Sequence, residues 1–115
     1  QAGADAVMIS APNQMALIRS GLKEELPLDE LAELVSGAVD LVLTEGYKSG
    51  DKDKIEVSRR VIAGGDLLCT EDELLAVVSD HPHDVRVPQF DLEDAKGVAE
   101  LLVAYLKKKS DGKKE

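Results

Sequence analysis

The sequence has few cysteines, which form the disulfides of small secreted domains, and few aromatic residues, which stack on nucleic-acid bases. Its 115 residues include one cysteine, no tryptophan and only three residues of the Phe or Tyr type. A lone cysteine excludes an internal disulfide, and so few rings argue against a stacking surface for nucleic acid. No apolar run approaches the roughly 18 residues that span a membrane, and the first residues lack a signal-peptide pattern. We expect a cytoplasmic protein that contacts neither membrane nor nucleic acid.

Charge is unevenly distributed along the chain. The net charge is −9, yet five lysines fall in the last nine residues, and the remainder has 9 cations against 21 acidic residues. An acidic body repels a phosphate backbone. With 43% hydrophobic and 32% charged residues, the composition is that of a globular protein, and the length fits one domain. We expect a single α/β domain over residues 1–107 and a disordered Lys-rich tail over 108–115.

The hydrophobic pattern predicts an antiparallel hairpin followed by a mixed α/β sheet. Apolar runs at 6–10 and 15–18 flank turn residues, and helical spacing follows Pro27 until Gly37. Short apolar runs at 41–44, 55–58 and 74–79 resemble strands buried on both faces, with an edge strand within 85–90 and a loop over 59–73. A last helix is expected from Asp91, which would be its N-cap.

The clearest chemical signal is a carboxylate and a glycine directly after the predicted strand at 41–44. Glu45 and Gly46 occupy this position, where ligands approach the carboxyl ends of parallel strands. The arrangement is typical of a Walker-B-like element, in which the acid holds Mg²⁺ and the glycine amide faces a phosphate. An ordinary strand end with a solvated glutamate explains the same residues.

Five of the nine cations in the acidic body lie within residues 48–60. They are Lys48, Lys52, Lys54, Arg59 and Arg60. Such a cluster is a plausible site for an anion or a partner, and charge balance against Asp51, Asp53 and Glu56 is the alternative.

The run at 74–79 also ends in a carboxylate. Asp80 could accept paired hydrogen bonds from a guanine base, or it could cap a turn before Pro82. His81 and His83 have no accompanying metal-ligand pattern, so we interpret them as loop residues, and Cys69 as a packing residue. The chain has no Gly-x-x-x-x-Gly-Lys-Ser/Thr loop, so it offers only part of a nucleotide site.

Several segments resemble, in consistent order, the adapter family of molybdopterin-guanine dinucleotide biosynthesis, the MobB proteins. The most specific match is the stretch from Asp40 to Lys48 with the strand Lys54-Ile55-Glu56-Val57, similar to the family's L-V-L-V-E-G-[FY]-K and P-K-I-x-V segments. Weaker matches are the starting Ala2-Gly3-Ala4-Asp5, the Ala76–Asp80 segment and Val87-Pro88-Gln89-Phe90. The resemblance covers residues 1 to about 107.

The resemblance implies a partial P-loop NTPase-like fold, with a mostly parallel sheet, flanking helices and the antiparallel hairpin. Family members bind GTP with Mg²⁺, hydrolyse it weakly, form homodimers and assist the guanylyltransferase that attaches GMP to molybdopterin. By this resemblance Glu45 is the Walker B acid and metal ligand, Gly46 the phosphate-facing glycine and Asp80 a guanine contact.

One departure from the family pattern limits the expected activity. The family's first strand, its Walker A loop and the following helix have no counterpart in residues 1–115. We therefore expect this chain alone to bind GTP poorly and to be inactive as a GTPase, and an uncovered sheet edge to favour dimerisation. The alternative is a non-enzymatic interaction module that keeps the fold and has lost nucleotide binding.

Overall fold

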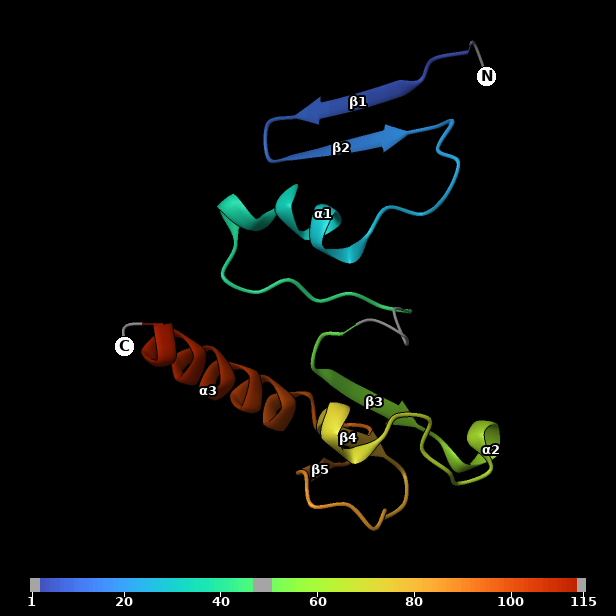
Figure 1. Cartoon of the computed structure of the whole chain (residues 1–115), viewed down its shortest axis with the longest axis vertical. Coiled ribbons are helices and arrows are strands. Elements are labelled where there is room, and N and C mark those ends of the chain that lie inside the picture. The colour runs from blue at the N-terminus through green and yellow to red at the C-terminus, as the bar shows by residue number, and fades with distance from the viewer. Residues whose placement is uncertain (1–2, 47–50, 114–115) are drawn as a thin grey trace.

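The computed structural model describes residues 3–46 and 51–113 and contains two separate sheets (Figure 1). The elements, in chain order, are β1 (Ala6–Ala11), β2 (Gln14–Arg19), α1 (Leu28–Glu33), the 3-10 helix η1 (Ser36–Ala38), β3 (Lys54–Ser58), α2 (Arg60–Ala63), the 3-10 helix η2 (Glu71–Glu73), β4 (Leu74–Ser79), β5 (Gln89–Phe90) and α3 (Ala95–Lys113). None of the helices in this part of the chain has the length and hydrophobicity needed to cross a bilayer.

The first sheet is the predicted hairpin. β1 and β2 pair antiparallel from Ala6 opposite Arg19 to Ala11 opposite Gln14, so Pro12 and Asn13 form a two-residue turn. Every residue of both strands is exposed. The hairpin therefore forms its backbone ladder without burying either face against the rest of the described chain.

The second sheet is parallel and holds the core. β4 lies between β3 and β5, in the order β3-β4-β5. Ala76 and Val77 of β4 are fully buried, as is typical of the central strand of a parallel sheet. This confirms the mixed α/β fold with a parallel sheet, an antiparallel hairpin and helices.

The segment at 41–44 departs from the prediction of a strand, because it has no regular secondary structure and joins no ladder. A strand is defined by its hydrogen-bonded neighbour, and no described segment lies in register with this one. The prediction of a loop over 59–73 also needs correction, since α2 and η2 form within it. β5 is limited to two residues of the expected 85–90 run.

The last helix begins later and ends later than expected. The Asp94 carboxylate accepts a hydrogen bond of 2.9 Å from the Gly97 amide, so Asp94, not Asp91, caps the helix. Asp91 instead uses its carbonyl to accept a bond from the Asp94 amide. α3 continues to Lys113, so residues 108–113, expected to be a disordered tail, are helical in the structure.

The molecule is elongated. Its Cα radius of gyration is 17.7 Å, whereas a compact domain of this length has about 13 Å. The hairpin lies at one end, away from β3, β4, β5 and α3, and α1 lies between the two parts (Figure 1). A large part of the apolar surface of the hairpin end is consequently open to solvent.

Candidate functional site

The segment at 41–44 ends at the predicted acid–glycine pair. Glu45 and Gly46 are both exposed, and Gly46 has a φ of +93°. This left-handed conformation favours glycine over residues with a side chain. An added Cβ at Gly46 would meet no atom within 4 Å, so the space beside its backbone is open to a ligand.

A groove of about 950 Å³ lies between this segment, α1, β3 and α3. Its apolar wall includes Val42, Leu43, Ile55, Val57 and Leu102. Three of the predicted site residues, Gly46, Lys54 and Arg59, line the same groove. Glu45 is not among its lining residues, so the structure gathers part of the predicted site rather than all of it.

The basic cluster is partly balanced by acidic side chains. Lys54 Nζ donates to the Lys52 carbonyl at 3.0 Å and lies 3.9 Å from Glu73 Oε1. Lys52 Nζ is 3.0 Å from Asp29 Oδ1 in α1 and 4.0 Å from Asp51 Oδ1. Lys48 lies outside the described residues.

Two of the acidic residues near the cluster have other partners. Asp53 accepts a hydrogen bond from the Tyr105 hydroxyl and lies 4.0 Å from Lys109 Nζ, so it connects this loop to α3. Glu56 accepts hydrogen bonds from the backbone amides of Leu68 and Cys69, at 2.7 and 2.8 Å. From the sequence alone, Glu56 was interpreted only as a charge that balances the basic cluster, because its hydrogen-bond partners lie twelve and thirteen residues away in the chain.

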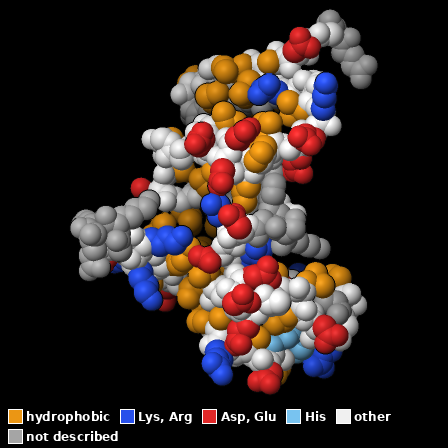
Figure 2. Space-filling view, in the orientation of Figure 1, with side chains coloured by type: hydrophobic (Ala, Val, Ile, Leu, Met, Phe, Trp, Pro, Cys, Tyr) orange, Lys and Arg blue, Asp and Glu red, His pale blue; other side chains and the backbone are white. Residues whose placement is uncertain are grey.

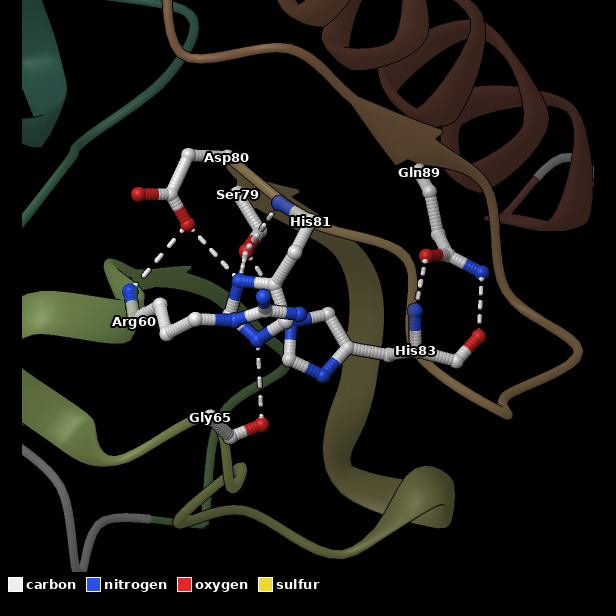
Figure 3. A network of polar contacts seen from close by, with 7 residues as sticks. All are labelled: Arg60, Gly65, Ser79, Asp80, His81, His83 and Gln89. Carbon is white, nitrogen blue, oxygen red and sulfur yellow. Dashed lines mark hydrogen bonds and ion pairs between the residues drawn. The ribbon is translucent and has the colours of Figure 1, made fainter.

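Asp80 lies at the end of β4, as predicted, and its Oδ1 atom has two partners (Figure 3). It accepts a hydrogen bond from the Arg60 amide at 3.1 Å and lies 2.7 Å from His81 Nδ1. The His81 contact, helped by the Arg60 amide, lowers the pKa of Asp80. Arg60 therefore meets Asp80 through its backbone.

The two histidines are part of a hydrogen-bond network that the sequence analysis did not foresee. His81 Nε2 is 3.1 Å from the Gly65 carbonyl, and His83 Nε2 is 3.0 Å from Ser79 Oγ. His83 also exchanges two backbone-to-amide hydrogen bonds with Gln89, of 2.8 and 2.7 Å. The Gly64-Gly65 pair was the sequence feature that could have indicated this network. Both glycines have a positive φ, and the turn that they form returns the chain to the end of β4.

Asp80 and His81 line a shallow hollow of about 300 Å³ at the ends of β4 and β5, together with Phe90 and Asp91. The hollow shares no lining residue with the larger groove. Within residues 3–46 and 51–113, no three His, Cys, Asp or Glu side chains are grouped to hold a metal ion.

Three comparisons with known proteins agree. The family model described as molybdopterin guanine dinucleotide synthesis protein B (MobB) matches residues 1–80. The molybdopterin-guanine dinucleotide biosynthesis adapter protein of Escherichia coli (strain K12) is 29% identical over 113 residues, and the match covers 96% of this chain. This chain spans 65% of the length of that relative.

A crystal structure of molybdopterin-guanine biosynthesis protein B superposes on the fold with a TM-score of 0.68 and 30% sequence identity. The match covers 91% of this chain and 69% of that structure. Similarity in both sequence and fold over most of the chain, with the family match over more than half of it, settles the assignment. The chain belongs to the MobB family of molybdopterin guanine dinucleotide synthesis proteins.

Proposed function

We propose that this chain is the GTP-binding adapter region of a protein that acts in molybdopterin guanine dinucleotide biosynthesis and assists a guanylyltransferase. Family membership supports the pathway, and the relative named as an adapter supports a role beside another enzyme. The observation that carries the nucleotide proposal is the groove with Gly46 on its wall.

The groove has the features expected of a site that binds one additional β-strand. The segment at 41–44 joins no ladder within the described chain, and β3 pairs there only with β4, along one edge. Backbone groups on both sides are therefore available to an inserted strand. We propose that a strand leading into a Gly-rich Lys-Ser/Thr loop, from outside residues 1–115, occupies this groove and completes the phosphate site.

Each predicted residue then has a defined task. Mg²⁺ is usually held by one or two carboxylates together with substrate phosphates, and the exposed Glu45 fits as such a carboxylate. Mg²⁺ would neutralise charge on the phosphates. The Gly46 amide would face the terminal phosphate, and Asp80 would accept hydrogen bonds from the guanine base.

Calorimetry with Mg²⁺-GTP tests this proposal. We expect weak binding to the chain alone and clear binding to a protein carrying the family's N-terminal segment in front of Gln1. In that extended protein Glu45→Gln should weaken Mg²⁺-dependent binding by about tenfold or more, because a metal ligand loses its charge. Glu33→Gln, in exposed α1, is the control. Equal GTP affinity in the Glu45 and Glu33 variants would refute the assignment of Glu45.

A second candidate function is an interaction module without nucleotide chemistry, and the hairpin favours it. Six large apolar side chains of β1 and β2 are between 45% and 62% exposed, and Figure 2 shows hydrophobic side chains gathered over this end. Surfaces of this kind mark protein contacts. We propose that the hairpin forms a homodimer contact. If the extended protein dimerises but binds no GTP, the interaction module is the better description.

A further inference from the structure

The Asp80 carboxylate is held at one oxygen and free at the other. Its Oδ1 atom accepts a hydrogen bond from the Arg60 amide at 3.1 Å and lies 2.7 Å from His81 Nδ1 (Figure 3). Within residues 3–46 and 51–113, its Oδ2 atom has no hydrogen-bond partner. A carboxylate oxygen has about two lone-pair sites, so the two donors fill Oδ1 and leave Oδ2 to bind a ligand.

One free oxygen is enough to bind the donor edge of guanine. The N1–H and 2-amino groups of this base project from the same edge of the ring, so both can donate to one anionic oxygen placed between them. Asp80 lines the hollow at the ends of β4 and β5, and its side chain is 36% exposed, so a base in the hollow can reach Oδ2. The direction in which Oδ2 points then decides how well guanine is bound.

The His81 ring, which holds the other oxygen, is itself fixed. Its side chain is 8% exposed, and its Nε2 atom lies 3.1 Å from the Gly65 carbonyl. A carboxylate and a carbonyl only accept hydrogen bonds, so the protonated ring donates to both. The hydrogen bond from His81 is also the main cause of the lowered pKa of Asp80, ahead of the Arg60 amide, so it favours the ionised carboxylate.

We propose that His81 is a positioning residue for guanine, which acts by holding Asp80 so that Oδ2 faces the base. This inference rests on the proposed function, in which Asp80 contacts guanine, and it adds a residue that does not touch the nucleotide. Without the bond from Nδ1, the carboxylate keeps only the Arg60 amide and can rotate about its broad terminal torsion. Guanine would then lose part of its bonding through the 2-amino group.

A purely structural role of His81 gives a different expectation. The bond from Nε2 to the Gly65 carbonyl holds the segment 60–65, and its loss would affect the fold whichever base is bound. Two substitutions separate these roles, because the side-chain nitrogen of asparagine is as many bonds from Cα as Nδ1, and that of glutamine as many as Nε2. His81→Asn therefore keeps a donor for Asp80, and His81→Gln keeps a donor for Gly65.

An NMR titration of the Asp80 carboxyl group in the chain alone tests the contact. We expect its pKa to lie below the ordinary value in the unaltered chain and in His81→Asn, and closer to the ordinary value in His81→Gln, which lacks the donor. His83→Gln is the matched control, since His83 bonds Ser79 and not Asp80. An ordinary Asp80 pKa in the unaltered chain, or equal values in the two His81 variants, would overturn the proposal.

The preference for GTP over inosine triphosphate (ITP) tests the function, because ITP lacks the 2-amino group. Calorimetry uses the protein that carries the family's N-terminal segment, at about pH 6, where the His81 ring is protonated. We expect GTP to bind about tenfold or more tightly than ITP, as is typical of a hydrogen bond to a charged group. His81→Gln should reduce this preference by about threefold or more, whereas His81→Asn and His83→Gln should keep it.

The outcomes distinguish this inference from the proposed function. An N-terminally extended protein that binds no GTP would refute both. GTP binding with a preference that His81→Gln leaves unchanged, even where the affinity for both nucleotides falls, would refute the positioning role alone. Equal binding of GTP and ITP by the unaltered protein would refute the guanine contact of Asp80 and with it this role. If His81→Gln fails to fold, His81→Asn decides, because a preference lost in that variant would show that the Gly65 bond matters and the Asp80 bond does not.

Discussion

Gly97 occupies a position in α3 where a side chain does not fit. A Cβ there would lie 2.5 Å from Asp94 Oδ2 and 2.9 Å from the Phe90 ring. We expect Gly97→Ala to destabilise the fold by about 1 kcal/mol, because displacing the Asp94 cap outweighs the better helix propensity of alanine. Urea unfolding measures this. Gly37→Ala, at a site with no neighbour within 4 Å of the added Cβ, should be neutral or slightly stabilising.

Glu56 is the residue that links β3 to the loop before η2. Its two carboxylate oxygens each accept one backbone amide, from Leu68 and from Cys69. Glutamine has only one acceptor oxygen, so Glu56→Gln should leave one amide without its partner and cost about 1–3 kcal/mol in unfolding free energy. Glu93→Gln, an exposed site on the chain, is the control and should be near neutral.

The same substitution has a chemical readout at Cys69. Burial, and then the hydrogen bond and charge of Glu56, raise the pKa of the Cys69 thiol. Removing that charge should lower the thiol pKa toward its usual range and speed alkylation at mildly alkaline pH. An unchanged alkylation rate in folded Glu56→Gln would contradict this account.

At the scale of elements, the hairpin exposes six large apolar side chains, three from each strand. Val7, Ile9 and Ile18 share one face of the paired strands, since Val7 lies opposite Ile18 and side chains alternate between faces. Burying such a side chain contributes about 1.5–3 kcal/mol. We therefore expect Ile9→Lys to weaken a homodimer by tenfold or more in sedimentation experiments, the control being Ser10→Lys on the opposite face. A monomer at tens of micromolar for the unaltered chain would contradict the dimer proposal.

Helices and strands could be predicted from the sequence where the local hydrophobic pattern matches the environment of the segment in the folded chain. β4 was recognisable because its uninterrupted apolar run is buried between two neighbours, and the hairpin because its turn residues lie between two apolar runs. The run at 41–44 has the same pattern but forms no ladder, because pairing depends on a neighbour that the pattern does not encode. The helix α2 was missed, since its four residues show no helical periodicity.

At the scale of the whole molecule, three titratable groups make the free energy of unfolding depend on pH. The Thr70 amide and hydroxyl lower the pKa of Glu73, and His81 lowers that of Asp80, so their contributions are lost as the pH falls through those lowered values. The raised pKa of His81 adds stability that is lost as the pH rises through it. Their combined contribution is therefore largest between 4.5 and 6.5, the ordinary values of Glu and His.

Urea midpoints at about pH 3, 5.5 and 9 test this window. We expect the highest urea midpoint at the middle pH. Asp80→Asn should make the midpoint depend less on pH in both directions, because it removes the lowered pKa of Asp80 and the main cause of the raised pKa of His81. His83→Gln should keep the profile of the unaltered chain, because no contact with Asp80 is lost. A profile that Asp80→Asn leaves unchanged would show that other groups set the pH dependence.

The sequence by itself determined the fold class, the parallel core strands, the hairpin and the family, because these follow from hydrophobic periodicity, turn residues and short motifs that are local in the chain. The tertiary structure alone decided which distant groups meet. It joined Asp80 and His81 to the segment 60–65, and Glu56 to the loop at 68–69. It also separated the groove lined by Gly46 from the hollow beside Asp80. Such contacts depend on chain packing across twelve or more residues, for which hydrophobic spacing carries no signal.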